Sequence, residues 1–350
     1  MTLTQLTADD IDRRLAEYAT TLKDTNAARA IERYVPNLPT HARTVKLADG
    51  LPTPVTPPAI SESPVWIKRD DLTSTLYGGN KVRKLEFLLD RPARHGWTVL
   101  SGGGSASHHI IASVLYCRLL GIDAEFAVFN QPDNPTVAVL QRLTDATGTK
   151  LYRMPGPYWY PAALAAACAK IAARGRFPML LPPGGSTPHG VLGYVDSALE
   201  IADSVTAGDC PEPDIIFCAL GSGGTAVGLA LGLELAGLQS RVFAVRVADA
   251  TANNKTVLRA IESGARGLLA VAGTRVPSAL DRLTVSNGYF GAGYGEPTAA
   301  GAAAIETGRH IGIHVDQTYT AKALAAALDH AYAHPTQTTM FVNTLSETGV

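Results

Sequence analysis

Apolar residues recur along this chain with two periods, one typical of helices and one typical of strands. Near the start they recur every three or four positions, which predicts a helix from about Thr7 to Leu22. The apolar positions of this helix are Ile11, Leu15, Tyr18 and Leu22. Asp10 lies three residues after Thr7, the spacing of a capping box at a first helical turn. Residues 36–64 are rich in proline and are expected to be irregular.

From residue 65 onward, short apolar runs alternate with helical patterns. Strands are expected at 65–68, 98–100, 124–129, 150–152, 179–181, 214–220, 241–247 and 339–342. Helices are expected at 85–89, 110–120, 137–147, 162–173, 193–207, 225–235, 299–308 and 321–333. Because strands alternate with helices, the pattern predicts an α/β protein whose parallel sheets carry helices on both faces.

Composition narrows the class of protein. A chain of 350 residues with 46% hydrophobic and 17% charged residues is long enough for two domains with ample cores. The net charge is -1 and no basic run is present, so nucleic acid is not an expected partner. No run of about 18 apolar residues offers a membrane span. The first ten residues lack the apolar core of a signal peptide, so a cytoplasmic location is expected.

The four cysteines and nine histidines do not suggest a disulfide framework or a metal site. The cysteines are Cys117, Cys168, Cys210 and Cys218, and no pair has CxxC spacing, so free thiols in a reducing compartment are expected. His108 and His109 are adjacent and would point in different directions on a helix. His310 and His314 are four residues apart, but no carboxylate completes a ligand set, and no metal is expected.

The segment Gly78–Glu86 reads Gly-Gly-Asn-Lys-Val-Arg-Lys-Leu-Glu and carries the first candidate chemistry. A lysine amine can form a Schiff base with a carbonyl group of a cofactor or substrate. A lysine beside glycines more often lies in a solvated turn. Lys81 therefore gains a catalytic interpretation only if other segments supply the remaining parts of a cofactor site.

The loop Gly221-Ser222-Gly223-Gly224-Thr225 follows an expected strand and opens an expected helix. Glycines let backbone amides approach an anion, and a helix N-terminus adds partial positive charge, so the loop predicts a phosphate site. Two alternatives remain, a dinucleotide fingerprint with Asp249 as ribose ligand, and a purely structural turn. The late position of the loop in the chain disfavours the dinucleotide.

In the lysine segment and the glycine loop together, the chain resembles the pyridoxal-phosphate-dependent 1-aminocyclopropane-1-carboxylate deaminase and D-cysteine desulfhydrase family. This family is of the tryptophan-synthase-β type, fold type II. The resemblance covers about residues 36–344, and its landmarks occur in the family's order. They are Lys68-Arg69-Asp70-Asp71, Gly78–Glu86, Gly103–His109, Gly184-Gly185-Ser186, Gly193-Tyr194, Gly221–Thr225, Gly293-Tyr294-Gly295 and Tyr319-Thr320-Ala321-Lys322.

The resemblance implies two open three-layer domains built on parallel sheets, with the cofactor in the cleft between them. Residues 1–83 and 189–350 would form the large cofactor-binding domain, in which residues 1–30 are an N-terminal extension. Residues 84–188 would form the small inserted domain. The extension is expected to be a surface helix, a cover of the cleft or a contact with a partner subunit. A homodimer is the family expectation.

The resemblance also implies roles for residues that bind the cofactor, pyridoxal 5'-phosphate. Lys81 would hold it as a Schiff base, and Asn80 would help to place the ring. Lys84 would reach the phosphate together with the loop Gly221–Thr225. Lys84 lies one helical turn after Lys81, so both side chains can face one cleft.

Three further residues would contact the substrate. Ser107 matches a serine that lies over the cofactor ring and helps to move a proton. Tyr294 and Tyr319 match two tyrosines of the substrate pocket, where either hydroxyl can act as acid, base or carboxylate donor. A lone tyrosine is more often a half-buried packing residue, and the motifs around these two give them the functional interpretation.

Two positions, 320 and 108, bear on the place of this chain within the family. The deaminase branch has glutamate after the tyrosine matched by Tyr319, whereas this chain has Thr320. Thr320 and Thr344 are thus the hydroxyl candidates for the ring nitrogen, where a hydroxyl weakens the electron sink and favours the desulfhydrase branch. His108 replaces the family asparagine that binds the cofactor phenolate and the substrate carboxylate. Histidine can donate one such bond, and it also titrates near neutral pH.

These residues predict an enzyme that acts on a small amino acid by α,β-elimination or deamination and releases a 2-oxo acid and ammonia. D-cysteine desulfhydrase is the nearest named activity. A β- or γ-substitution, or a specialised biosynthetic reaction of the same family, remains an alternative because of His108. A non-catalytic amino-acid- or nucleotide-binding protein is the alternative from another class, and the intact lysine segment disfavours it.

Overall fold

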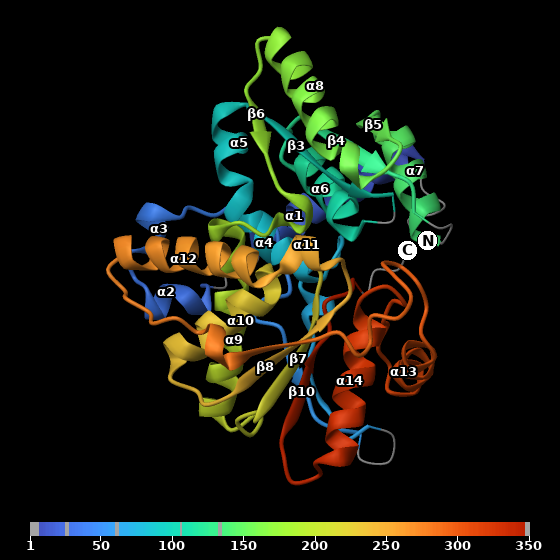
Figure 1. Ribbon diagram of the computed structural model, residues 1–350. Coiled ribbons are helices and arrows are strands. Elements are labelled where there is room, and N and C mark those ends of the chain that lie inside the picture. The colour runs from blue at the N-terminus through green and yellow to red at the C-terminus, as the bar shows by residue number, and fades with distance from the viewer. Residues whose placement is uncertain (1–6, 25–27, 60–62, 106, 132–134, 347–350) are drawn as a thin grey trace.

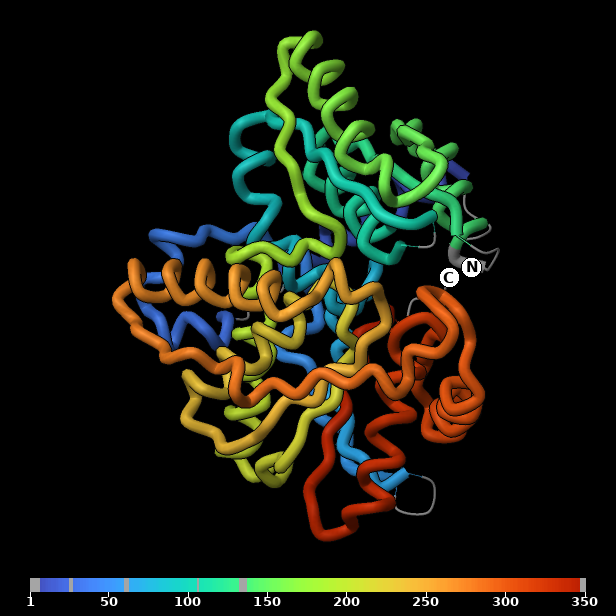
Figure 2. The backbone as a smooth tube through the Cα atoms, viewed as in Figure 1, coloured from blue at the N-terminus to red at the C-terminus, as the bar shows by residue number. Residues whose placement is uncertain are grey.

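The computed structural model describes residues 7–24, 28–59, 63–105, 107–131 and 135–346. They form an α/β structure with two sheets, one of six strands and one of four strands (Figure 1). Figure 2 follows the backbone from its blue N-terminal part into the green second sheet and back to the yellow, orange and red strands of the large sheet. None of the helices in this described part of the chain is both long and apolar enough to cross a membrane.

The large sheet has the strand order β1-β2-β10-β7-β8-β9. Its strands are β1 (Val55–Thr56), β2 (Trp66–Lys68), β7 (Ile215–Leu220), β8 (Arg241–Arg246), β9 (Leu283–Ser286) and β10 (Thr339–Val342). Every pair is parallel except β1 with β2, which is a short antiparallel pair at one edge. The predicted α/β class is therefore confirmed, with one antiparallel pair that the sequence pattern did not indicate.

Helices cover both faces of the large sheet. One face carries α9 (Pro188–Ala207), α10 (Gly224–Ala236) and α12 (Lys255–Val271), and the other carries α13 (Ala299–His310) and α14 (Thr320–Ala333). Successive residues of a strand point to opposite faces. In β7, Ile216 and Cys218 accordingly pack under α9 and α10, whereas Phe217 between them packs against α14.

The second sheet has the order β5-β4-β3-β6, and all of its pairs are parallel. Its strands are β3 (Thr98–Gly104), β4 (Ala124–Phe129), β5 (Lys150–Met154) and β6 (Pro178–Leu180). The helices around it are α5 (Asp90–His95), α6 (His108–Leu119), α7 (Pro135–Thr147) and α8 (Tyr160–Ala173). All of these strands lie between residues 84 and 188, while the domain boundaries themselves stay a prediction.

The N-terminal helix α1 (Ala8–Asp24) packs against the helices of the second sheet, on the small-sheet side of the molecule. Its four predicted apolar positions are buried there, and Arg118 of α6 binds the carboxylate of Asp12 at 2.7 and 2.8 Å. The predicted capping box is confirmed, because the amide of Asp10 donates to the Thr7 hydroxyl at 3.3 Å and the amide of Thr7 donates to the Asp10 carboxylate at 3.1 Å. The remainder of the expected extension, residues 1–6 and 25–27, lies outside the described residues.

Several elements were not predicted. The stretch 36–64 contains the short helix α3 (Leu38–His41) and strand β1, and α2 (Ala30–Tyr34) precedes it. Helix α12 and strand β9 lie in a region for which no element was expected. The expected helix at 85–89 is longer and begins at Asn80, so that α4 (Asn80–Leu88) includes both lysines of the signature. The short helices α5 and α11 (Ala250–Asn253) were not predicted either.

Candidate active site

The predicted site residues converge on one pocket of about 310 Å³. It lies where β3, β7 and β10 end, as expected for a ligand site at the carboxyl ends of parallel strands. The predicted residues that line it are Asn80, Lys81, Lys84, Ser107, His108, Gly221, Ser222, Gly223, Thr225, Tyr294, Tyr319, Thr320 and Thr344. Gly224 is the one predicted residue outside this lining, and its amide donates to the Ser186 hydroxyl at 3.0 Å beside the pocket.

The lysine helix begins on the end of the last strand. The amide of Asn80 donates to the carbonyl of Thr344 at 3.1 Å. Gly79 has a φ of 86°, and a Cβ there would lie 2.5 Å from the same carbonyl oxygen, so only glycine fits. Lys81 follows as the second residue of α4 and points its amine into the pocket.

The amine of Lys81 is suited to imine formation. Burial lowers its pKa to about 8, against an opposing attraction from the Asp316 carboxylate. Its Nζ donates to Oδ1 of Asn80 at 2.6 Å, which holds it in one place. A lysine of this pKa has a sizeable neutral, nucleophilic fraction near neutral pH, whereas an ordinary lysine has almost none.

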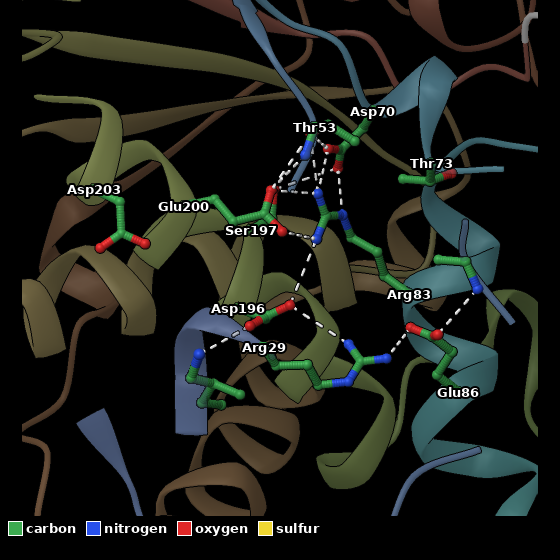
Figure 3. Close-up of polar contacts among 12 residues, drawn as sticks. Arg29, Thr53, Asp70, Thr73, Arg83, Glu86, Asp196, Ser197, Glu200 and Asp203 are labelled. Atoms are coloured by element: carbon green, nitrogen blue, oxygen red, sulfur yellow. Dashed lines mark hydrogen bonds and ion pairs between the residues drawn. The ribbon is translucent and has the colours of Figure 1, made fainter. Parts of the chain in front are cut away.

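A buried ionic network anchors α4 from behind (Figure 3). Arg83, which lies between the two lysines, is fully buried and donates to Asp70 at 2.8 Å and to Glu200 of α9 at 2.7 and 2.8 Å. Lys68 of β2 also binds Glu200, at 2.7 Å. Although burial alone would raise the pKa of Glu200, Arg83 and Lys68 lower it to about 2. The network thus joins the lysine helix to the large sheet and to α9.

A second part of this network holds the other end of α4. Arg29 donates to the carboxylates of Glu86 and Asp196, and Glu86 also accepts the backbone amides of Leu47 and Ala48 at 2.9 and 3.0 Å. Burial and the nearby charge of Glu200 raise the pKa of Asp196 to about 6. Four segments far apart in the chain therefore meet on α4. They contribute Arg29, the amides of residues 47 and 48, Asp70, and the carboxylates of α9.

The other lysine of the signature, Lys84, forms one wall of an anion-binding cradle. Its amine is buried and donates to the carbonyl of Gly184 and the hydroxyl of Ser186, each at 3.3 Å. Among the described residues it has no carboxylate partner, and burial together with the charge of Lys81 lowers its pKa well below the ordinary value. An anion placed beside this amine would restore its charge.

The glycine loop supplies the other wall of the cradle. Gly223 has a φ of 90°, and a Cβ on Gly224 would lie 2.5 Å from Oγ of Ser186 and 3.1 Å from Nζ of Lys84. The hydroxyls of Ser186 and Ser222 are 2.7 Å apart. Helix α10 starts here and directs its free amides at the same space. A buried amine that an anion would charge, a helix N-terminus and clustered hydroxyls are a donor set suited to a phosphate group.

Aromatic hydroxyls line the opposite side. The hydroxyls of Tyr294 and Tyr319 are hydrogen-bonded to each other, and Nδ1 of His108 lies 2.6 Å from the hydroxyl of Tyr77. Burial raises the pKa of Tyr319 well above its usual value, and Tyr294 raises it further. Both tyrosines are thus protonated donors at neutral pH. Ser107, directly before α6, completes this side.

The two threonines proposed for the ring nitrogen differ in their contacts. The hydroxyl of Thr320 donates to Oδ1 of Asp316 at 2.6 Å and accepts the Asp316 amide at 2.7 Å. Thr320 is therefore engaged in the cap of α14, although it borders the pocket. Thr344 is the better candidate for a hydroxyl that faces a ligand.

Sequence reasoning missed several residues that border the pocket or hold its walls. Asp316 lines it and accepts the amides of Thr318, Tyr319 and Thr320, a capping arrangement that its spacing before α14 could have indicated. Ser186 lay inside a recognised landmark without an assigned role. Tyr77 and Tyr160 carried no signal, because their contacts with the pocket come only from the folded chain.

Comparison with known proteins identifies the family of this chain. The family model described as "Pyridoxal-phosphate dependent enzyme" matches residues 48–344. D-cysteine desulfhydrases of Salmonella paratyphi A and Salmonella schwarzengrund are each 32% identical over 293 residues, which cover 80% of this chain and 86% of the relative.

Solved structures give the same result for the fold. A structure described as an ACC deaminase homologue has a TM-score of 0.75 and 28% identity, and covers 90% of this chain and 95% of its own. Threonine deaminase isoform 2 from Solanum lycopersicum has a TM-score of 0.57 at 13% identity, with 92% and 90% covered, and supports the fold alone. The chain belongs to the family of pyridoxal-phosphate-dependent enzymes, with the fold type II architecture.

Proposed function

We propose that this protein uses pyridoxal 5'-phosphate to convert a small amino acid by α,β-elimination or deamination, in the manner of a D-cysteine desulfhydrase. The observation that carries the proposal is the pairing of two lysines in one pocket. Lys81 offers an amine with a pKa of about 8, and Lys84 offers a buried amine that an anion would charge and that has no carboxylate partner among the described residues. The first suits an aldehyde and the second suits a phosphate.

The residues present fit the cofactor. Lys84, the amides at the start of α10 and the hydroxyls of Ser222 and Thr225 would hold the phosphate. Asn80 and Thr344 would contact the ring, and Lys81 would bind the aldehyde carbon. When bound, the cofactor supplies an electron sink that acidifies the α-carbon of an amino acid joined to it.

The protein's own side chains would then handle protons and orientation. Lys81, once its amine is free, is the base that takes the proton from the substrate α-carbon and can return it. Tyr294 and Tyr319 stay protonated, so they act as donors to a substrate carboxylate or to a leaving group. Ser107 lies on the same side and would assist this proton transfer.

The choice of elimination over other reactions follows from the residue that would face the ring nitrogen of the cofactor. Thr344, which lines the pocket, would offer a hydroxyl there, and a hydroxyl keeps the ring a weaker electron sink than a carboxylate does. Elimination of a good leaving group needs less carbanion stabilisation than ring opening of a cyclopropane. The relatives named as D-cysteine desulfhydrases support the same choice.

Three further features are proposed on the strength of the family resemblance. They are a homodimer, a cytoplasmic location and a division into residues 1–83 with 189–350 and residues 84–188. Light scattering of the purified protein tests the homodimer. Limited proteolysis between the two sheets tests the domain division.

The visible absorption spectrum tests the cofactor proposal. The purified protein should be yellow, and Lys81→Ala should lose the imine band while Lys170→Ala, a surface lysine of α8, should keep it. A colourless wild-type protein that binds a nicotinamide dinucleotide instead would contradict the proposal.

A panel of D- and L-amino acids, assayed for 2-oxo acid, ammonia and sulfide, tests the reaction. Small amino acids with a leaving group at the β-carbon should react, D-cysteine foremost. If only bulky or phosphorylated substrates react, the desulfhydrase assignment is wrong while the cofactor assignment stands.

A further inference from the structure

At position 108 this chain has a histidine where the family has an asparagine. The neutral imidazole ring of histidine has two tautomers. His108 is the first residue of α6 and lines the pocket. Its Nδ1 lies 2.6 Å from the hydroxyl of Tyr77, whose side chain is only 1% exposed. Because the Tyr77 hydroxyl is buried and bonded to one nitrogen of the half-buried His108 ring, this hydrogen bond governs which nitrogen of His108 carries a proton.

We assign Tyr77 as the donor in this bond, because Nδ1 of His108 is the one acceptor that its hydroxyl reaches among the described residues, and a buried hydroxyl proton without an acceptor is costly. Burial and the Asp316 carboxylate both raise the pKa of Tyr77, so its hydroxyl keeps its proton at any pH at which the enzyme works. Burial and the charge of Lys81 lower the pKa of His108, against an opposing effect of Asp316. A neutral imidazole has one N–H, and a nitrogen that accepts a hydrogen bond does not carry it.

Two charged groups of the described residues act on the pKa of His108, and they oppose each other. Lys81 of α4 disfavours the charged imidazole, and Asp316, before α14, favours it. The ring of Tyr319 meets His108 edge-on with centroids 6.2 Å apart, and Tyr77 is the side chain bonded to Nδ1. The carboxylate of Asp316 is itself occupied by three backbone amides and the Thr320 hydroxyl.

We propose that Tyr77 is a positioning residue that fixes His108 in the tautomer protonated on Nε2. The Nδ1 edge of the ring faces Tyr77, so Nε2 is the nitrogen left to meet a ligand in the pocket. His108 then presents a neutral N–H donor to an anionic oxygen of the substrate or cofactor. The identity of that oxygen rests on the proposed function, whereas the tautomer rests on the contact with Tyr77 alone.

The roles of Tyr77 and His108 depend on each other. An amide side chain always has a donor, so it needs no partner to select one. An imidazole has a donor in a given direction only if its tautomer is set. Tyr77 and His108 therefore act as a unit, and the hydroxyl of Tyr77 matters only while residue 108 is histidine.

Nitrogen NMR of the full-length protein labelled at histidine tests the tautomer, with and without cofactor. The His108 signals are identified by their loss in His108→Asn. Wild type should show a protonated Nε2 and an accepting Nδ1, and Tyr77→Phe should give a mixture of tautomers. Tyr160→Phe is the matched control, because it removes a buried hydroxyl of the pocket that has no hydrogen-bond partner among the described residues. A proton on Nδ1 in wild type, or no change in Tyr77→Phe, overturns the inference.

A double-mutant cycle on the holoenzyme separates positioning from a structural role. Tyr77→Phe should lower kcat/KM by roughly tenfold to a hundredfold in the wild-type background, the scale of a lost hydrogen bond to a charged group. In the His108→Asn background it should have almost no effect. An equal loss in both backgrounds would show that Tyr77 only supports the fold. If no amino acid reacts, the NMR result still decides the tautomer, so failure of the proposed function is recognised separately.

Discussion

Arg83 and Glu200 meet through two hydrogen bonds of 2.8 and 2.7 Å, at a place where their side chains are 0% and 3% exposed. One residue belongs to the helix that carries both signature lysines, and the other belongs to α9. Gly193 lets these helices cross closely, because a Cβ there would lie 2.3 Å from the carbonyl oxygen of Arg83. The ion pair therefore ties the position of Lys81 to the core of the large sheet.

Glu200→Gln should strongly destabilise the protein. The change keeps the shape of the side chain but leaves Lys68 and Arg83 short of one buried negative charge. Removing one partner of a buried pair typically costs roughly 3–5 kcal/mol. Urea denaturation of the cofactor-free protein measures the loss. Glu306→Gln, which breaks an exposed pair with Arg309, is the control and should change stability by less than about 1 kcal/mol.

Lys84→Met should abolish phosphate binding without weakening the cofactor-free fold. The amine lies among neutral oxygens, so a charge on it is unfavourable in the empty cradle and becomes favourable when an anion binds beside it. Inorganic phosphate should raise the melting temperature of the cofactor-free wild type, since a ligand that binds only the folded state stabilises it. Phosphate should leave the melting temperature of Lys84→Met unchanged. An equal phosphate effect in both proteins would place the anion elsewhere, and Lys170→Met serves as the surface control.

The rate of imine formation should depend on pH through Lys81. Its pKa is lowered to about 8, and only the neutral amine attacks an aldehyde. The rate at which cofactor-free protein takes up pyridoxal 5'-phosphate should therefore rise as pH increases through 8 and level off above it. Stopped-flow absorbance gives this profile. A midpoint near 10, the value of an unperturbed lysine, would contradict the effect of burial.

Gly224→Ala should weaken cofactor binding at least tenfold, because its methyl group would press on Ser186 and on the amine of Lys84. Gly267→Ala is the matched control, since it is a helical glycine of α12 with open space where a Cβ would lie. That change should slightly stabilise the protein, by up to about 1 kcal/mol. Equilibrium titration with pyridoxal 5'-phosphate compares the two variants, and equal affinities would argue against the cradle.

Most of the fold could be read from the chain because buried parallel strands and their covering helices have strong periodic patterns. Helix α12 was missed although Leu258, Ile261, Ala265 and Leu269 have helical spacing and are all buried. Strand β9 gave little signal, since it is a four-residue edge strand that is only half buried. Its pairing with β8 exists only once the sheet has formed.

The residues of the site likewise fall into those that a local motif predicts and those that only the folded chain brings together. Lys81 and Gly221–Thr225 could be found because each is a continuous motif whose chemistry is local. The partners of these motifs come from other segments, and linear order carries no trace of the contact between Tyr77 and His108 or of Ser186 with Gly224. Thr320 shows the reverse case, because a residue predicted from its place in the order also bonds its hydroxyl to a helix cap, a contact that the sequence did not indicate.

The start of α4 rests on the segment after β10, where the amide of Gly78 donates to Ser346 at 2.9 Å across 268 residues of sequence. During synthesis on the ribosome, the signature lysine emerges long before this support exists. The nascent chain thus cannot present the finished start of α4 until residue 346 has been translated, so vitamin B6 capture follows the synthesis of both sheets.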